Sequence, residues 1–194
     1  MIAEKIFTIF QSRTPRVLGG KHLKPAAVLV PIQERADGDY LVLTQRATML
    51  SSHRGQVAFP GGRVDRQDPG PLAAALRESD EEIGINPGDV RILGQLDQVT
   101  AASNYLVTPF VGLIPSPYEF RLNPAETAAV FCVPISALLD RQRFSVEPRS
   151  YPSLRHDPIY HFHYESWDIW GATARIIAQL LELAYGFEIQ EHPD

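Results

Sequence analysis

Three glutamates at helical spacing are the residues best suited to chemistry. Glu78, Glu81 and Glu82 stand at positions i, i+3 and i+4 of the stretch 71–83. At 3.6 residues per turn, this spacing places the three carboxylates on one face of a helix. Like charges at i and i+4 repel, so the cluster needs compensation. A hard divalent cation supplies it, and we expect Mg²⁺, with Mn²⁺ as a substitute, because Mg²⁺ prefers oxygen ligands.

A glycine turn comes shortly before this helix. Gly61 and Gly62 follow Pro60, and residues without a Cβ allow backbone groups to come close to a metal or its ligand. The alternative for the acidic stretch alone is a solvated helix face. The ordered succession of glycine turn, acidic loop, Arg-Glu pair, paired glutamates and terminal Gly84 argues against that alternative.

The elements that position these residues are strands with few helices between them. Pro71 suits the first turn of the acidic helix, and Gly84 suits its end. We expect strands at 26–31, 40–44, 56–59, 92–96, 106–114, 128–133 and 159–164, and further helices near the start of the chain and at 135–139 and 172–185. This order predicts a single layered α/β (α+β) domain over residues 26–194, preceded by an N-terminal helix and basic connector over residues 1–25.

Composition restricts the classes of partner. The 194 residues carry a net charge of −5 and include 44% hydrophobic residues, which is typical of a globular protein and gives no sign of a basic face for nucleic acid. The single cysteine, Cys132, excludes an internal disulfide. The start of the chain does not resemble a signal peptide, and prolines interrupt the longest uncharged stretch, 98–118. We expect a cytoplasmic protein with no membrane partner.

The stretch from Gly62 to Ile85 resembles the Nudix box. That box is a glycine, five residues, Glu, seven residues, then Arg-Glu-apolar-x-Glu-Glu-x-Gly-apolar, and Arg77 begins its second half here. Two departures are Asp68 in place of the first glutamate, with eight residues before Arg77, and Ser79 in place of an apolar residue. The resemblance implies a Nudix fold with a mixed β-sheet between helices, and metal-dependent hydrolysis of a pyrophosphate bond.

Three further segments are similar to the coenzyme A diphosphatase branch of that family: residues 43–47, 55–62 and 170–174. This similarity implies hydrolysis of coenzyme A to 3′,5′-ADP and 4′-phosphopantetheine. Ser51 stands where that branch has an arginine, although Arg54 lies one helical turn further on. ADP-ribose, NADH or another nucleoside diphosphate derivative is therefore the alternative substrate. A Nudix-fold ligand sensor without turnover is the third hypothesis.

The resemblance also implies roles for individual residues. Glu78 and Glu126 are alternative general bases, and a cap or surface role is equally open for Glu126. Arginines can hold phosphates with two donors, which suits Arg46 and Arg54, whereas Arg54 is as readily a solvated side chain. The partner is a small molecule, and a homodimer is left open. The expected catalytic residues are Arg77, Glu78, Glu81 and Glu126; the metal ligands are Gly62, Glu78, Glu81 and Glu82; the substrate contacts are Arg46, Arg54, Gly61 and Tyr105.

Overall fold

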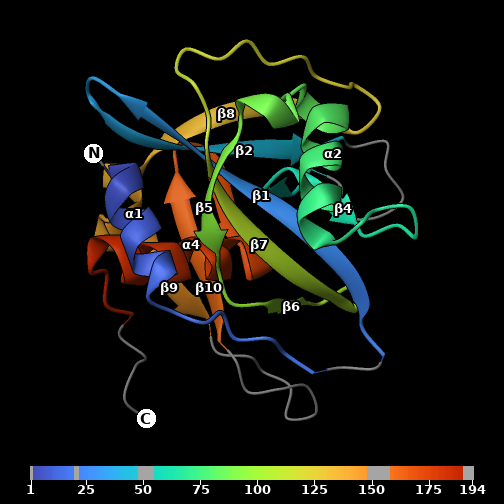
Figure 1. Ribbon diagram of the computed structural model, residues 1–194. Coiled ribbons are helices and arrows are strands. Elements are labelled where there is room, and N and C mark those ends of the chain that lie inside the picture. The colour runs from blue at the N-terminus through green and yellow to red at the C-terminus, as the bar shows by residue number, and fades with distance from the viewer. Residues whose placement is uncertain (1, 20–21, 48–54, 148–157, 190–194) are drawn as a thin grey trace.

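The computed structural model describes residues 2–19, 22–47, 55–147 and 158–189 (Figure 1). An eight-stranded mixed sheet forms the middle layer, helix α2 covers one face, and helices α1 and α4 lie on the other. The helices are α1 (Ile2–Gln11), α2 (Pro71–Ile83), α3 (Ile135–Leu138) and α4 (Gly171–Tyr185). The strands are β1 (Lys24–Arg35), β2 (Gly38–Arg46), β3 (Val57–Ala58), β4 (Gly61–Arg63), β5 (Arg91–Gln95), β6 (Val99–Ala101), β7 (Tyr105–Leu113), β8 (Thr127–Pro134), β9 (Phe144–Glu147), β10 (Ile159–Tyr164) and β11 (Trp167–Trp170).

Strands β1 and β2 form a hairpin, and the two strands separate from each other away from the turn. Near the turn the two strands pair with each other, from Ile32 opposite Leu41 to Arg35 opposite Gly38. Away from the turn, β1 pairs with β4 and β2 pairs with β3 instead. The segment 57–63 therefore fills the space between two diverging strands. This insertion places the glycine turn inside the sheet, under the acidic helix.

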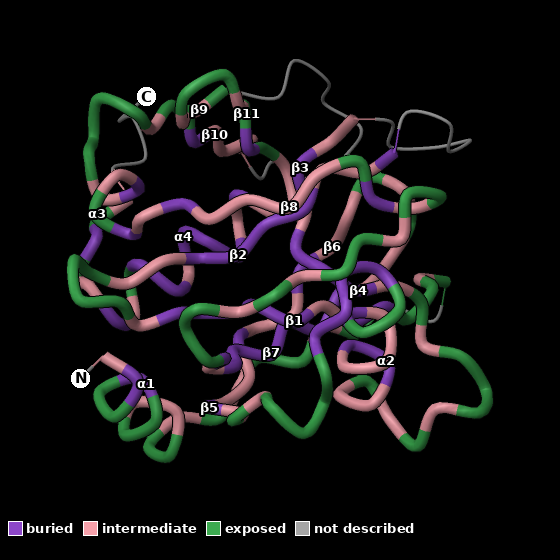
Figure 2. Tube along the Cα trace, turned by 90° about the horizontal axis from the view of Figure 1, so that it is seen from above, coloured by how far each residue is buried: buried purple, intermediate pink, exposed green. Residues whose placement is uncertain are grey.

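The outer strands complete the sheet. Strand β7 pairs with β1 in parallel, and β5, β6 and β8 add antiparallel pairs to β7 and β2. Side chains along β1 point alternately to the two faces of the sheet, and most of them are buried because both faces are covered. Ala26, Val30 and Ile32 belong to the core under α1 and α4, whereas Ala27 and Leu29 belong to the cores under α2. Figure 2 shows the buried segments following these central strands.

A second, three-stranded sheet in the order β11-β10-β9 packs beside the C-terminal helix. Its inner face carries Phe144, Phe162 and Ile169, which join the core under α4. Trp167 stacks on Phe131 of β8, with 4.4 Å between ring centroids. These contacts attach the small sheet to the large one. Among the described residues, no helix is long and apolar enough to cross a membrane.

The predicted layered α/β fold is confirmed, and most element boundaries agree within two residues. The predicted short strand 56–59 is confirmed as β3, but the glycines after Pro60 are not only a turn: they begin a further strand, β4, that was not predicted. Three further strands were not predicted, namely β6, β9 and β11. Each has only three or four residues, so its apolar pattern is too short to detect, and its strand character depends on the pairing partner.

Candidate functional site

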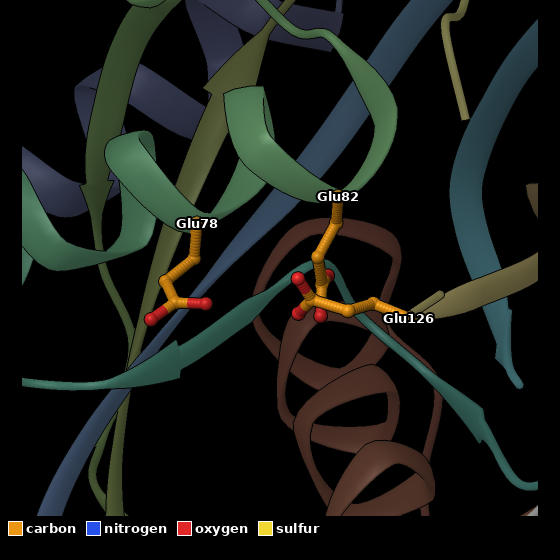
Figure 3. A group of neighbouring side chains, drawn as sticks. All are labelled: Glu78, Glu82 and Glu126. Atoms are coloured by element: carbon orange, nitrogen blue, oxygen red, sulfur yellow. The ribbon is translucent and has the colours of Figure 1, made fainter. Parts of the chain in front are cut away.

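Three carboxylates from two separate segments meet at one point beside the sheet. Glu78 and Glu82 project from one face of α2, and Glu126 enters from the loop before β8 (Figure 3). One ligand oxygen of each residue lies within 4.8 Å of those of the other two. The side chains of Glu78 and Glu82 are 16% and 4% exposed. The site is therefore a largely buried concentration of oxygen donors.

The glycine turn forms the floor of this cluster. The backbone N–H of Gly61 donates to Oε2 of Glu82 at 3.2 Å. A Cβ on Gly62 would lie 2.5 and 2.6 Å from the carboxylate oxygens of Glu78, so no larger residue fits without displacing that carboxylate. Gly61 adopts a φ of +147°, and a side chain there would collide with Ala27 and Val28 of β1. Both glycines are thus required by close packing.

The loop that carries Glu126 is tied to both sides of the site. The side-chain amide of Asn123 donates to Oε1 of Glu126 at 3.0 Å, and its backbone N–H donates to the carbonyl of Glu82 at 2.9 Å. The carbonyl of Glu126 accepts from the N–H of Ala47, at the end of β2, at 2.8 Å. These bonds hold the loop between α2 and β2. Glu126 is therefore held beside Glu78 and Glu82 and is not a loose surface residue.

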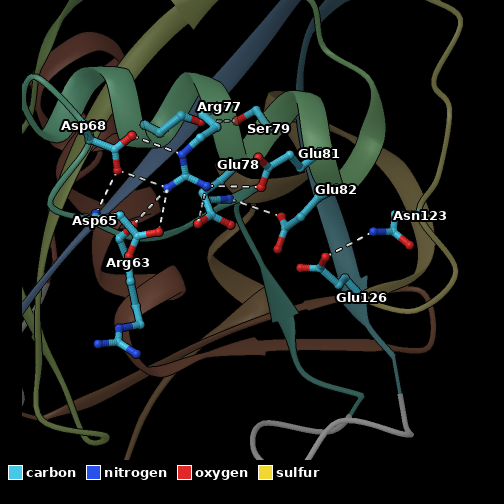
Figure 4. Close-up of polar contacts among 12 residues, drawn as sticks. Arg63, Asp65, Asp68, Arg77, Glu78, Ser79, Glu81, Glu82, Asn123 and Glu126 are labelled. Carbon is cyan, nitrogen blue, oxygen red and sulfur yellow. Dashed lines mark hydrogen bonds and ion pairs between the residues drawn. The ribbon is translucent and has the colours of Figure 1, made fainter.

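Arg77 organises the other side of the helix (Figure 4). Its Nε and one terminal nitrogen each donate to an oxygen of Asp68 at 3.0 Å, a paired geometry that fixes the guanidinium plane. The remaining terminal nitrogen donates to Oε1 of Glu78 at 3.0 Å and to Oε2 of Glu81 at 3.1 Å. Arg77 thus orients Glu78, and Asp68 orients Arg77. The hydrogen bonds from Arg77 lower the pKa of the Asp68 carboxyl.

The structure does not bring Glu81 into the cluster. Its side chain is 52% exposed and its described ion-pair partner is Arg77. Successive residues of a helix are about 100° apart, so Glu81 and Glu82 cannot both point at the same site. Glu78 and Glu82 are only about 40° apart, and Glu126 takes the third position. The sequence pattern identified the acidic face but not which of its members points inward.

Ser79, the departure from the apolar position of the box, is fully buried. Its hydroxyl donates to the carbonyl of Ala75, one turn earlier, at 2.6 Å. This bond satisfies the hydroxyl group within the helix, so Ser79 can occupy the place of an apolar side chain. Gly84 ends the helix in the left-handed conformation at φ 72°, where its N–H donates to the carbonyl of Asp80.

Burial disfavours the charged form of the carboxyl groups of Glu78 and Glu82. It raises the pKa of Glu82 to about 7, against the lowering effect of the Gly61 N–H and of Arg46. Burial likewise raises the pKa of Glu78, and the nearby Arg77 partly offsets the effect. Repulsion by the Glu126 carboxylate raises the pKa of both groups further, and repulsion by Glu78 adds to the increase at Glu82. A cation placed among the oxygens would remove this penalty.

The residues present fit a divalent cation. The donors are carboxylate oxygens, which hard cations prefer, and Gly62, having no Cβ, lets the backbone of β4 lie directly against the Glu78 carboxylate. Glu78, Glu82 and Glu126 would hold the ion. Gly62 was expected among the ligands, and the structure places it directly beside Glu78.

The expected substrate contacts divide into two groups. Arg46 lies next to the cluster: one terminal nitrogen is 3.6 Å from Oε1 of Glu82, and its Nε is buried without a hydrogen-bond partner among the described residues. Tyr105 packs instead against the core under α4, beside the ammonium group of Lys24. Arg54 lies outside the described residues. The structure thus brings Arg46 and Gly61, but not Tyr105, to the glutamates.

Sequence reasoning missed two positioning residues. The role of Asp68 was unassigned, because the length of the loop before α2 differs from the box and pairing with Arg77 depends on how that loop folds. Asn123 lies in the same short loop as Glu126, three residues earlier. The sequence signal that could have indicated Asn123 is its place directly before Pro124 and three residues before the candidate carboxylate of Glu126.

Comparison with known proteins identifies relatives over most of the chain. The NUDIX domain model matches residues 23–156. NudL of Photorhabdus laumondii, described as an uncharacterized Nudix hydrolase, is 43% identical over 157 residues, which are 81% of this chain and 83% of NudL. NudL of Escherichia coli strain K12, described in the same words, is 42% identical over 158 residues, 81% of each chain.

Solved structures agree in fold. A Nudix hydrolase from M. smegmatis, RenU, superposes with a TM-score of 0.51 at 21% identity, over 63% of this chain and 76% of RenU. The Ap4A hydrolase of C. elegans in a binary complex superposes with a TM-score of 0.50 at 21% identity, over 57% of this chain and 80% of that enzyme. The family match and the close relatives show that this chain belongs to the Nudix hydrolases, the enzymes that cleave pyrophosphate bonds.

Proposed function

We propose that the chain hydrolyses the pyrophosphate bond of coenzyme A in the presence of Mg²⁺, giving 3′,5′-ADP and 4′-phosphopantetheine. One observation carries the proposal. Two of the three segments that resemble the coenzyme A diphosphatase branch, 43–47 and 55–62, border the glutamate cluster directly. Arg46 from the first segment approaches Glu82, and Gly61 and Gly62 from the second contact Glu82 and Glu78.

The chain's own residues divide the work of hydrolysis. Arg46 has a buried Nε with no hydrogen-bond partner among the described residues, and it can donate to the oxygens of a phosphate. Glu126, held by Asn123, is a candidate to accept the proton of the attacking water, and Glu78 is the alternative. When bound, a divalent cation would offset the phosphate charge and make that water more acidic. Arg77 keeps Glu78 in place throughout.

Product analysis tests the substrate. The purified protein is incubated with Mg²⁺ in H₂¹⁸O, separately with coenzyme A, ADP-ribose and NADH, and the products are identified by mass spectrometry. We expect 3′,5′-ADP and 4′-phosphopantetheine to form fastest, with ¹⁸O on the attacked phosphorus. Faster cleavage of ADP-ribose or NADH would replace the proposed substrate by another nucleoside diphosphate derivative. No cleavage with Mg²⁺ or Mn²⁺ would favour a ligand sensor.

A Glu82→Gln substitution tests the site itself. It removes one charge at the cluster and almost no volume, so we expect kcat to fall by about 10²-fold or more while the fold persists. Glu81→Gln is the matched control, because Glu81 lies on the same helix but outside the cluster. We expect a smaller loss from Glu81→Gln. Equal losses from both variants, or an unchanged rate in Glu82→Gln, would contradict this assignment of the metal ligands.

A further inference from the structure

A second group of cationic side chains lies on the other face of the sheet, at the open end of the β1-β2 hairpin. Arg63 of β4 pairs with Ala26 of β1, and Lys24 of β1 pairs with Tyr105 of β7. Directly paired residues point to the same face of a sheet, and residues i and i+2 do so as well. Ala26 belongs to the core on the α4 side. Lys24, Arg63 and Tyr105 therefore share that side; we call them the cationic row.

The cationic row and the glutamate cluster are adjacent, on opposite faces of β4. Arg63 directly follows Gly62, and a Cβ on Gly62 would point toward Glu78 on the α2 side. Neighbouring residues of a strand point to opposite faces, so Arg63 leaves β4 in the opposite direction. Figure 4 shows its guanidinium extending away from α2, past the carboxylates. A ligand bound at the glutamates thus reaches Arg63 by passing the edge of a single strand.

The two cations have no carboxylate partner in the part of the chain that the structure describes. Arg63 and Lys24 are exposed, and neither nitrogen group lies within 4.0 Å of an acidic oxygen there. The ammonium group of Lys24 lies 6.0 Å from the ring centroid of Tyr105. By contrast, Arg13 of the same basic N-terminal region is already paired with Asp97. Lys24 and Arg63 are thus cations at this end of the sheet that have no carboxylate partner among the described residues.

We propose that the cationic row binds a phosphate monoester carried by the substrate in addition to its pyrophosphate. The pyrophosphate itself must lie at the glutamate cluster, where Arg46 is the available donor. The cationic row, on the opposite side of β4, meets a different anionic group. The inference rests on the proposed function, because coenzyme A carries one such group, the 3′-phosphate, which ADP-ribose and NADH lack. Tyr105 forms an apolar wall beside it.

The test compares coenzyme A with 3′-dephospho-coenzyme A. In Arg63→Gln and Lys24→Gln we expect KM for coenzyme A to rise about tenfold, the equivalent of ~1.4 kcal/mol for one lost ionic contact. We expect less than about a twofold change for the dephospho substrate, and nearly constant kcat for both. Arg66→Gln, an exposed arginine of the same segment outside the cationic row, is the matched control. Equal effects on both substrates, or none, would overturn the proposal.

A binding measurement separates this inference from the proposed function. Calorimetry of the metal-free protein with 3′,5′-ADP and with 5′-AMP requires no turnover. We expect the wild-type protein to bind 3′,5′-ADP more tightly, and Arg63→Gln to bind the two nucleotides equally. If coenzyme A is not hydrolysed but this preference holds, the proposed function fails and the phosphate site stands. If the wild-type protein shows no preference, the phosphate site is refuted even when coenzyme A is hydrolysed.

Discussion

Glu82 is a carboxylate whose surroundings favour its protonated form until a cation arrives. Burial raises its pKa to about 7 from an ordinary value of 4.5. The unfolded chain loses this proton near 4.5, whereas the folded metal-free protein keeps it until about 7. Between these values the unfolded state binds fewer protons, so the free energy of unfolding falls as the pH rises, and it levels off above 7. Glu82 therefore destabilises the metal-free protein at neutral pH.

The first prediction concerns stabilisation by Mg²⁺ at two pH values. The cation competes with the proton for Glu82, so its effect must grow as the pH rises through about 7. Ligand at about 100 times its Kd contributes ~2.7 kcal/mol, or about 5–10 °C in Tm for a protein of this size. We expect such a shift at pH 8 and less than about 2 °C at pH 5, measured by differential scanning calorimetry.

Glu82→Gln provides the control for this prediction, because glutamine has no proton to exchange. Its Tm should depend less on pH between 5 and 8 than that of the wild-type protein, and Mg²⁺ should raise it less. An equal Mg²⁺ shift at both pH values in the wild-type protein would show that the cation binds elsewhere. The measurement needs no substrate, so it is independent of the proposed reaction.

The sequence could predict those site residues whose positions follow from helix geometry, but not those whose positions depend on the path of a loop. The spacing of Glu78 and Glu82 follows helix geometry, which a sequence displays directly. For Glu126 the sequence left two roles open, a general base or a cap or surface residue. Hydrogen bonds to Asn123 and Ala47 explain its position beside the other glutamates. The pairing of Asp68 with Arg77 depends on the path of the loop between β4 and α2. No periodic pattern encodes that path.

At the scale of elements, the insertion of β3 and β4 between β1 and β2 creates the site. The inserted segment brings Gly61 and Gly62, which have no side chain, beneath α2, and the carboxylate of Glu78 packs against Gly62. The sequence indicated a strand and a breaker here, but not the separation of the hairpin. That separation depends on pairing between residues more than ten positions apart in the chain, such as Ala27 and Gly62. Local propensity carries little information about such pairing.

The second prediction is that Gly62→Ala impairs catalysis more than stability. The added Cβ would meet the carboxylate of Glu78, the mobile end of a side chain, so the backbone can remain in place while the carboxylate moves. Displacing a ligand by about 1 Å can cost about 10²-fold in rate. We expect kcat/KM to fall by about that factor, with a Tm within about 5 °C of the wild-type value. Steady-state kinetics and calorimetry measure the two effects.

Gly70→Ala is the matched control for this substitution. Gly70 lies in the same segment, at the start of α2, and a Cβ there would meet no atom within 4 Å. Its φ of 169° is extended backbone that any residue adopts. Activity within about twofold of the wild-type value is expected. Comparable losses in both variants would mean that general disturbance of the loop, and not contact with Glu78, limits the rate.

At the scale of the molecule, α1 packs into the main core, although it precedes the stretch 26–194 over which the sequence predicts the domain. Ala3 and Ile6 are each 1% exposed, and the N–H of Ala3 donates to Oε1 of Glu34 at 2.9 Å. Phe10 lies against Gly94 of β5, where a Cβ would not fit. The connector that follows is fixed through Arg13 and its partner Asp97. The basic residues of the N-terminal region thus serve partly to fasten it.

This packing gives the third prediction, that Ile6→Ala destabilises the whole domain without changing the chemistry. Removing a fully buried isoleucine side chain costs ~2–5 kcal/mol. At about 2–4 °C per kcal/mol, Tm should fall by roughly 4–20 °C. In contrast, kcat measured well below Tm should stay within about twofold, because the glutamates lie on the other face of the sheet. Lys5→Ala, the exposed neighbour, should leave Tm nearly unchanged. If Ile6→Ala also leaves Tm unchanged, α1 contributes nothing to the stability of the domain.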